Sequence, residues 1–300
     1  MNIALIDIGG TNIKYALSDE EGTFILQGKQ PTEAFKGADA VYVNVCGIID
    51  SMSEKAHISG IAISTAGQVD VKTGNIVYAT DGIPGYTGFA LKDRLKGRFK
   101  CPVSVENDVN CSALGNLWKG NMDEDTFIAL TIGTGIGGAI VLDGRIFHGA
   151  SGSAGEIGHM TLIKDGLPCN CGDSGCYERY ASAQALEKQI IAALGDMSTK
   201  QFFNKVRSGD TKALAVFSQW IDFLTEGLKS LVHILNPPLV MIGGGITAQG
   251  ALLEDAINDS LRKKIMKSFS KPLKVKLMTM GNDANLYGAL YWFLKSECDY

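Results

Sequence analysis

The alternation of apolar and polar positions predicts a regular succession of strands and helices along the chain. Short apolar runs of the strand type cover residues 3–8, 60–64, 102–106, 239–242 and 273–277. Helical patterns cover residues 38–53, 89–99, 111–120, 252–268 and about 282–294.

One further helix is marked by an apolar stripe that ends before Pro237-Pro238. Its apolar residues recur at steps of three and four: Leu214, Phe217, Ile221, Leu224, Leu228, Leu231 and Leu235. This spacing predicts a long amphipathic helix whose apolar face packs in the core or against another subunit.

Two stretches of the sequence echo each other. Residues 3–10 read IALIDIGG and residues 128–138 read IALTIGTGIGG, and each continues into a second strand. The repetition predicts a duplicated, two-domain architecture with glycine turns facing each other across a cleft. We place a smaller N-terminal domain at residues 1–120 plus a C-terminal helix at about 283–300. A larger C-terminal domain then covers residues 121–282.

The glycine turns present backbone N–H groups that suit a phosphate. In the first turn, Gly9 and Gly10 permit close approach, Thr11 adds a hydroxyl, and Asp7 could hold Mg²⁺ directly or through water. A plain hairpin turn with a solvated Asp explains this first turn equally well. The second turn offers a matching cradle of five residues: Gly133, Thr134, Gly135, Gly137 and Gly138. Neither turn is a Walker A loop or a Rossmann GxGxxG.

A cysteine-rich loop lies between residues 156 and 178. His159, Cys169, Cys171 and Cys176 together form a full tetrahedral ligand set for Zn²⁺. Because all four positions are filled by protein, the zinc should be structural and should brace the neighbouring Glu156 and Glu178. The alternative is a reduced cysteine cluster without a metal.

The segment ENDVN follows a buried strand and opens a helix. Asn107 is expected to cap that helix, and Asp108 falls in its first turn, where the helix N-terminus should keep the carboxylate ionised. A carboxylate at this point is suited to accept a proton from a substrate hydroxyl. An ordinary capping carboxylate is the other reading of the same residues.

Composition and charge indicate in which compartment the protein works and which partners it does not bind. The net charge is −4, which gives no nucleic-acid or polybasic membrane signature, and no apolar run approaches the roughly 18 residues of a membrane span. The N-terminus enters a strand directly, without the basic region or cleavage site of a signal peptide. Seven cysteines, three of them in the proposed zinc loop, suit a reducing compartment. We therefore expect a cytoplasmic protein.

Taken together, these motifs resemble the ROK family of bacterial sugar kinases, open-reading-frame proteins and repressors. The resemblance is carried over almost the whole chain by DIGGTNIK, ENDVN, TIGTGIGG, the ExGH of residues 156–159 and the CxCGxxGCxE of residues 169–178. It implies an α/β, actin-like (hexokinase-type) ATPase fold with two α/β domains around a cleft. It also implies an ATP-dependent kinase that uses ATP, Mg²⁺ and a structural Zn²⁺ and phosphorylates the 6-hydroxyl of a hexose.

The resemblance also assigns roles to matched positions. Asp108 would be the catalytic base that takes the proton of the sugar 6-hydroxyl. The sugar would be bound by Gly67, Asn107, Glu156, His159 and Glu178. Phosphate and nucleotide contacts would come from Gly9, Gly10, Thr11, Lys14, Thr134 and its glycines, and Gly243, Gly244 and Gly245. A homodimer is expected on the same ground.

The family pattern leaves the substrate open. The segments STAGQVD (residues 64–70) and DGIPGYTG (residues 81–88) differ from the matching glucokinase segments and look more like those of N-acetylmannosamine and β-glucoside kinases. Glucose and N-acetylmannosamine are equally favoured as predicted substrates, and both are favoured over fructose, allose and β-glucosides. A sugar-sensing relative without catalysis is the alternative class. Because the sequence starts at strand one, we expect no winged helix-turn-helix of the kind that repressors of the family carry, which favours an enzyme.

Overall fold

The computed structural model describes residues 1–79, 82–120 and 122–298. Three parts of the sequence predictions lie outside these residues: Asp81 at the start of the DGIPGYTG loop, Asn121 at the expected domain boundary, and residues 299–300 of the expected final helix.

The described residues form two compact units. Unit 1 consists of Met1–Asp123, Ile146–Ala154 and the C-terminal segment from Thr279. Unit 2 consists of Glu124–Arg145 and Gly155–Met278. The chain therefore enters unit 2, returns to unit 1 for Ile146–Ala154, and enters unit 2 again before its C-terminal helix.

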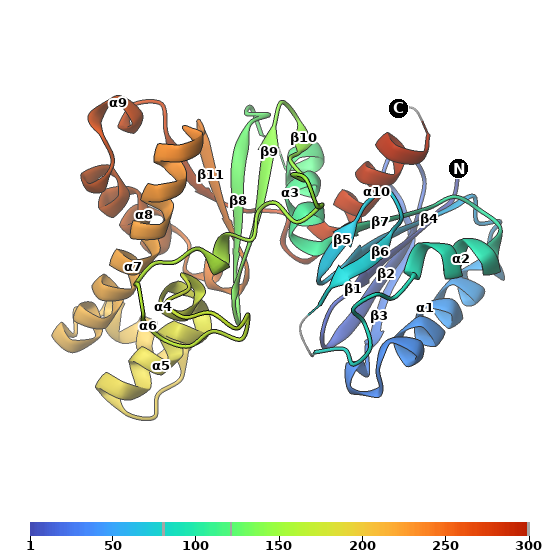
Figure 1. The fold of residues 1–300 in the computed structure, drawn as a ribbon. Helices are drawn as coiled ribbons and strands as arrows, with labels where there is room; N and C mark the ends of the chain where they lie inside the picture. The colour runs from blue at the N-terminus through green and yellow to red at the C-terminus, as the bar shows by residue number, and fades with distance from the viewer. Residues whose placement is uncertain (80–81, 121, 299–300) are drawn as a thin grey trace. The chain divides into compact units, whose positions relative to one another are not determined.

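Unit 1 is built on a five-stranded sheet with the order β3-β2-β1-β4-β7 (Figure 1). Its strands are β1 (Ile3–Ile8), β2 (Asn12–Ser18), β3 (Phe24–Pro31), β4 (Gly60–Thr65) and β7 (Val103–Asn107). The first three strands are antiparallel neighbours, whereas β4 is parallel to both β1 and β7. A separate small hairpin is formed by β5 (Gln68–Asp70) and β6 (Asn75–Tyr78).

Helices cover both faces of this sheet, which explains why β1 is buried at every position. Ala4, Ile6 and Ile8 pack toward α1 (Ala38–Ser53) and α2 (Leu91–Phe99). Ile3 and Leu5 point the opposite way, toward α3 (Asp108–Lys119) and α10 (Ala284–Glu297). The alternation of side chains along a strand thus feeds two cores at once.

Unit 2 repeats the same plan with the order β10-β9-β8-β11-β12. Its strands are β8 (Phe127–Ile132), β9 (Ile136–Leu142), β10 (Arg145–Ile146, whose last residue falls in unit 1), β11 (Leu239–Gly243) and β12 (Lys274–Leu277). Its helices are α4 (Glu178–Ala181), α5 (Ala183–Leu194), α6 (Thr199–Arg207), α7 (Thr211–Leu235), α8 (Ala251–Lys264) and α9 (Lys267–Ser270). The short 3₁₀ turns are η2 (Ile157–His159) and η3 (Gly245–Gln249) in unit 2, and η1 (Ala34–Lys36) and η4 (Gly281–Asp283) in unit 1.

The internal sequence echo corresponds to this repeated topology. β1 pairs antiparallel with β2 and parallel with β4, and β8 pairs antiparallel with β9 and parallel with β11. In both units the glycine turn therefore follows the central strand, β1 or β8, and leads into its antiparallel neighbour.

Most predicted elements appear within a few residues of their expected ends, with three differences. The helix expected over residues 252–268 is two helices, because the backbone becomes extended at Ile265, whose side chain turns into the core. The helix expected over residues 89–99 begins at Leu91, and Phe89 instead packs in the core before it. β3 was not anticipated, because its half-exposed sequence FILQGKQP lacks an apolar run.

The apolar stripe of α7 belongs to the core of unit 2. Leu224 and Leu228 are fully buried, and Phe217, Ile221 and Leu231 are nearly so. Leu214 and Leu235 at the two ends are the more accessible members of the stripe. The core interpretation of this helix is confirmed, and the homodimer stays a prediction.

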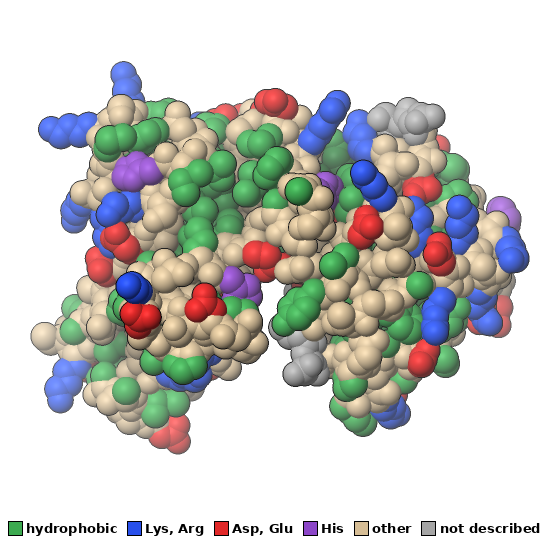
Figure 2. Space-filling model, in the orientation of Figure 1, with side chains coloured by type: hydrophobic (Ala, Val, Ile, Leu, Met, Phe, Trp, Pro, Cys, Tyr) green, Lys and Arg blue, Asp and Glu red, His purple; other side chains and the backbone are tan. Residues whose placement is uncertain are grey.

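The surface carries charges of both signs. On the face drawn in Figure 2, Lys and Arg side chains are interspersed with Asp and Glu side chains and gather into no single block. None of the helices formed by the described residues combines the length and the apolar character that a membrane span requires.

Candidate active site

In unit 1, the predicted site residues gather at one edge of the sheet. Parallel strands β1, β4 and β7 end at Ile8, Thr65 and Asn107, and these three ends lie in register. The first glycine turn, Gly67 and Asp108 each follow one of these ends. The carboxyl ends of parallel strands are where α/β proteins place their ligands.

Asp7 is the buried carboxylate of this edge, with 4 % of its surface exposed. One carboxylate oxygen, Oδ1, accepts hydrogen bonds from Ser64 Oγ at 2.8 Å and from Asn285 Nδ2 at 3.0 Å. The other oxygen, Oδ2, lies 3.7 Å from Lys14 Nζ. Because two donors hold Oδ1, Oδ2 is the oxygen oriented toward a cation.

The first glycine turn is held in shape by the backbone. Gly9 N–H donates to the carbonyl of Asn12 at 3.1 Å, and Thr32 Oγ1 donates to the carbonyl of Gly9 at 2.6 Å. Gly10 and Thr11 are exposed. A side chain added at Gly10 would meet no atom within 4 Å, so space remains for a ligand against that backbone.

The junction of β7 and α3 carries Asn107 and Asp108. Asn107 is the N-cap of α3, and its Oδ1 accepts from the N–H groups of Val109 and Asn110 at 2.8 and 3.1 Å, as predicted. Its Nδ2 donates to the carbonyl of Gly67 and to Asp108 Oδ1, each at 3.0 Å. Both ends of the Asn107 amide are therefore used, and they fix the orientation of the Asp108 carboxyl.

The electrostatics of Asp108 differ from the prediction. Burial, reinforced by the nearby negative charge of Asp7, raises the pKa of Asp108 to about 7. Hydrogen bonds from Val109 N–H and from Asn107 lower the pKa of Asp108 but do not outweigh those two causes. The expectation that the helix N-terminus keeps this carboxyl fully ionised is therefore wrong. A carboxyl that titrates near neutral pH is instead well suited to exchange a proton.

In unit 2, the second glycine turn lies beside the turn formed by Gly243, Gly244 and Gly245. β8 and β11 are parallel, with Thr131 opposite Gly243, so the turns after them leave the same edge of the sheet. A Cβ on Gly244 would lie 2.3 Å from the carbonyl oxygen of Ile132, which is why only glycine fits there. Of the five residues predicted for the second cradle, Gly133, Thr134 and Gly135 form the turn. Gly137 and Gly138 belong to β9.

The four predicted zinc ligands come together in unit 2. Their ligand atoms all lie within 4.8 Å of one another: His159, Cys169, Cys171 and Cys176. Cys171 Sγ and Cys176 Sγ are 3.6 Å apart, and Cys169 Sγ is 3.7 Å from His159 Nδ1. A tetrahedral ion with Zn–S bonds of about 2.3 Å separates its sulphur ligands by about 3.8 Å, so the cluster fits zinc.

The loop that brings these ligands together depends on its glycines. Gly172 and Gly175 have φ values of 95° and 78°, which few other residues adopt. A Cβ on Gly175 would lie 1.8 Å from the carbonyl oxygen of Ile163. Burial raises the pKa of the Cys176 thiol to about 12, so a thiolate there needs a compensating cation.

Tyr177 anchors this loop to the core of unit 2. Its side chain is fully buried, and its hydroxyl donates to the carbonyl of Leu224 at 2.6 Å. Gly227 of α7 leaves room for the ring, because a Cβ there would lie 2.4 Å from it. Cys176 and Glu178, the sequence neighbours of Tyr177, are thereby held in place.

Glu178 links the cysteine loop to the second glycine turn. Its Oε1 lies 3.4 Å from Cys169 Sγ, and its Oε2 accepts from the N–H of Ile136 at 3.3 Å. A Cβ on Gly135 would lie 2.3 Å from Glu178 Oε2. The predicted sugar-binding carboxylate, the cluster of predicted zinc ligands and the predicted phosphate turn are therefore connected within unit 2.

Glu156 directly precedes the 3₁₀ turn η2, and His159 is its last residue. Gly158 between them sits so close to β9 that a Cβ would lie 2.1 Å from the carbonyl oxygen of Ile136. The imidazole of His159 turns Nδ1 toward the cysteines, which leaves Nε2 as the nitrogen available for another partner. Glu156 is exposed.

Two residues that contact Asp7 were not among the predicted site residues. Ser64 is recognisable only by its register, since it stands opposite Asp7 in neighbouring strands. Asn285 belongs to α10, 278 residues away along the chain. Its only sequence signal is a polar residue on a helix face that otherwise packs in the core.

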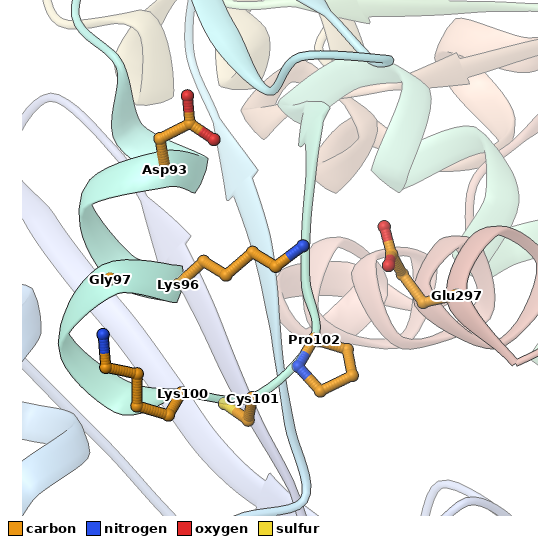
Figure 3. Close-up of a pocket in the computed structure, with 7 residues that line it drawn as sticks. All are labelled: Asp93, Lys96, Gly97, Lys100, Cys101, Pro102 and Glu297. Carbon is orange, nitrogen blue, oxygen red and sulfur yellow. The ribbon is translucent and has the colours of Figure 1, made fainter.

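A pocket elsewhere in unit 1 contains none of the predicted site residues. It lies between the C-terminal ends of α2 and α10 (Figure 3) and is lined by Asp93, Lys96, Gly97, Lys100, Cys101, Pro102 and Glu297. Its side chains carry charges of both signs, and Lys92 pairs with Glu297 at 2.7 Å beside it. This composition singles out no ligand class.

The sequence profile of the ROK family matches residues 3–296. The chain belongs to the ROK family. A glucokinase of Halalkalibacterium halodurans is 33% identical over 314 residues, covering 97% of this chain and 94% of the relative.

Solved structures of ROK relatives superpose along nearly the whole chain. A ROK family glucokinase from Streptomyces griseus, in complex with glucose and AMPPNP, is 31% identical with a TM-score of 0.80, covering 97% of this chain and 98% of the other. A Listeria monocytogenes protein described as a candidate N-acetylmannosamine kinase is 29% identical with a TM-score of 0.86, covering 99% and 100%. The predicted actin-like, hexokinase-type α/β fold is thus confirmed.

Proposed function

We propose that this ROK protein is an ATP-dependent sugar kinase that phosphorylates the 6-hydroxyl of a hexose. The observation that carries the proposal is the Asp108 carboxyl, with its pKa of about 7, next to a second carboxylate at the ligand-binding edge of a sheet that also bears a glycine turn. Membership of a family whose relatives are named as sugar kinases supports it.

In the proposed reaction, Asp108 accepts the proton of the sugar hydroxyl. The hydroxyl oxygen forms a bond to the γ-phosphorus of ATP, and the bond from that phosphorus to the β,γ-bridging oxygen breaks, releasing ADP. Asn107 keeps the Asp108 carboxyl in position through its Nδ2 hydrogen bond of 3.0 Å. At neutral pH a substantial fraction of Asp108 is ionised and able to act as the base.

The phosphates of ATP are proposed to lie on the glycine turns. Gly9, Gly10, Thr11 and Lys14 would contact one part of the polyphosphate, and the turn of Gly133, Thr134 and Gly135 another, with Gly243 to Gly245 on the adenosine side. Asp7 would hold Mg²⁺, directly or through water, by its Oδ2. A bound Mg²⁺ would neutralise charge on the transferring phosphate.

The sugar is proposed to be bound by Gly67, Asn107, Glu156, His159 and Glu178. The connection of Glu178 and His159 with the cysteine cluster supports a structural role for zinc, which would fix the orientation of His159 Nε2. Because His159, Cys169, Cys171 and Cys176 would fill all four positions, a bound zinc would have no open position and would supply no chemistry to the transfer itself.

Glucose and N-acetylmannosamine are the proposed substrates. A kinase for fructose or a β-glucoside is the runner-up, and a sugar sensor without catalysis is the alternative from another class. The carboxylate pair Asp7 and Asp108 supports the catalytic reading, since a sensor needs the sugar contacts but no base with a pKa near 7.

An ATP-dependent phosphorylation screen tests the proposal. The purified, zinc-loaded protein is offered glucose, N-acetylmannosamine, N-acetylglucosamine, fructose, mannose and a β-glucoside with Mg²⁺, and ADP formation is followed. One clearly preferred sugar is the expected result. Sugar binding by calorimetry without ADP formation would instead identify a sensor.

A further inference from the structure

Glu106, the residue two positions before Asp108, is a buried carboxylate with three hydrogen-bond partners. Only 1 % of its surface is exposed. Its Oε1 accepts from the backbone N–H of Asn107 at 2.7 Å and from Asn110 Nδ2 at 2.9 Å. Its Oε2 lies 2.7 Å from Nε2 of His148. A charged group so deeply buried is stable only when its oxygens are satisfied, and His148 satisfies Oε2.

His148 is held in a fixed place in unit 1. Its ring lies 5.3 Å from the ring of Trp292 in α10, measured between centroids. Its carbonyl accepts from the N–H of Ala154 at 3.1 Å, which closes the segment Ile146–Ala154 on itself. A second bond, from Ser153 Oγ to Gln68 Oε1 at 3.0 Å, fixes the same segment to β5.

His148 is therefore linked to Asp108 by hydrogen bonds through two residues, Glu106 and Asn107. His148 contacts Glu106, Glu106 holds the backbone N–H of Asn107, and Asn107 Nδ2 holds Asp108 Oδ1. All of these residues lie in unit 1. The last two of them form the junction where β7 becomes α3, so a shift of Glu106 moves the cap residue that orients Asp108.

We infer that His148 is a positioning residue for the proposed kinase reaction, acting through Glu106 and Asn107 to hold Asp108 in its working orientation. The inference rests on the proposed function of Asp108. It differs from a purely structural role because Glu106, the partner of His148, also accepts the backbone N–H of Asn107, the residue next to the base.

Loss of the His148 hydrogen bond leaves Glu106 Oε2 without a donor. The carboxylate then rotates toward another donor, and the N–H of Asn107 loses its fixed acceptor. The expected consequence is a loss in kcat that exceeds any rise in the KM for sugar, with little change in the KM for ATP. The base is misaligned, whereas the proposed ATP contacts and most of the proposed sugar contacts keep their places.

Two substitutions at one position separate the hydrogen bond from the ring. His148→Phe keeps an aromatic ring against Trp292 and removes the donor, whereas His148→Gln keeps a donor and removes the ring. We expect kcat to fall about tenfold or more in His148→Phe and to stay within about threefold of the parent in His148→Gln. His233→Phe is the matched control, because His233 also packs on an aromatic ring, that of Phe269 at 5.4 Å, but in unit 2.

Hydrogen exchange gives a readout that does not depend on activity. The amide of Asn107 should exchange faster in His148→Phe than in the parent and in His148→Gln. If exchange is faster in His148→Phe but the parent protein phosphorylates no sugar, the proposed function is refuted and the hydrogen-bond links between His148 and Asn107 are still supported.

Three results would overturn the inference. The first is an unchanged kcat in His148→Phe with an active parent. The second is an equal loss of kcat in both variants, which would assign the effect to the imidazole ring itself. The third is failure of His148→Phe to fold while His148→Gln folds, which would assign the bond to stability rather than to positioning.

Discussion

Among single residues, Asp108 matters most, because the proposed kinase reaction depends on its protonation state. A normal aspartate is ionised throughout the physiological range, yet burial and the charge of Asp7 raise the pKa of Asp108 to about 7. The shift lowers folded-state stability progressively as the pH rises from the ordinary aspartate pKa of 3.8 to about 7, and the full cost applies above that pH, because ionisation is harder in the native protein than in the unfolded chain. It also makes the carboxyl a stronger base when it is ionised.

Asp108→Asn should abolish phosphoryl transfer and leave sugar binding largely intact. The amide preserves the shape of the side chain but cannot accept the proton, so kcat should fall by about a thousandfold or more. Calorimetry with the preferred sugar should give an affinity within about threefold of the parent. At pH 8 the variant should unfold at no lower temperature than the parent, since it removes a poorly solvated charge. Near-normal turnover would refute the role of Asp108.

The same carboxyl predicts the pH dependence of activity. The base works only when ionised, so kcat/KM should fall about tenfold per unit as the pH drops below about 7 and should level off above it. Carboxyl NMR of Asp7→Asn provides the control. Removal of the Asp7 charge should lower the pKa of Asp108, and an unchanged titration would show that Asp7 does not act on it.

At the element scale, the cysteine loop and the α3–α10 pair hold the two groups of site residues. The loop is tied to α7 through Tyr177 and to the second glycine turn through Glu178. α3 carries Asp108 at its first turn, and α10 contributes Asn285 to Asp7. Damage to either element should therefore reach the chemistry without touching a site residue.

Cys171→Ser should release zinc and weaken sugar binding. Cys171 is an exposed ligand, so its replacement causes no packing change, and three remaining ligands hold zinc far less tightly. We expect metal analysis to fall from one zinc per chain to nearly none, and the dissociation constant for sugar to rise about tenfold. Cys101→Ser, a half-buried cysteine outside the cluster, is the control and should keep its zinc. Unchanged sugar affinity in metal-free Cys171→Ser would uncouple the loop from the sugar.

Gly288→Ala should disturb the packing of α10 on α3. A Cβ at Gly288 would lie 1.7 Å from the carbonyl oxygen of Cys111, so the helices must separate. Overpacking of this kind costs roughly 1–3 kcal/mol of unfolding free energy. Denaturant unfolding should show this loss, and kcat should fall as well because α3 moves.

Gly47→Ala is the matched control for that substitution. Gly47 lies in the middle of α1 and is exposed, and a Cβ added there would meet no atom within 4 Å. Alanine there should stabilise the protein by about 0.5–1 kcal/mol, since it removes backbone freedom from the unfolded chain. Equal effects of the two substitutions would contradict the close helix contact.

At the scale of the whole molecule, sequence reasoning succeeded where local chemistry dictates structure. The cap at Asn107, the cysteine loop with its glycines and the stripe of α7 each need only neighbouring residues, and the structure has all three. The repeated strand order was also visible, because the echo copies a whole strand–turn–strand unit.

The sequence patterns could not predict the contacts between residues far apart along the chain. The Asn285 bond to Asp7 joins residues 278 positions apart, and the His148 bond to Glu106 joins residues 42 positions apart. Neither Asn285 nor His148 belongs to a motif. The raised pKa of Asp108 has the same origin. It depends on burial and on Asp7, which lies on another strand, whereas the helix N-terminus alone suggests the opposite shift.

The most direct test of the proposed reaction is to identify the sugar oxygen that receives the phosphate. The parent protein is incubated with Mg-ATP and its preferred hexose, and the product is analysed by phosphorus–proton correlation NMR, with the 6-deoxy sugar as control. We expect phosphate on oxygen 6, no product from the 6-deoxy sugar, and no product from Asp108→Asn. Phosphate on another hydroxyl, or ADP formed without any sugar phosphate, would contradict the proposed reaction.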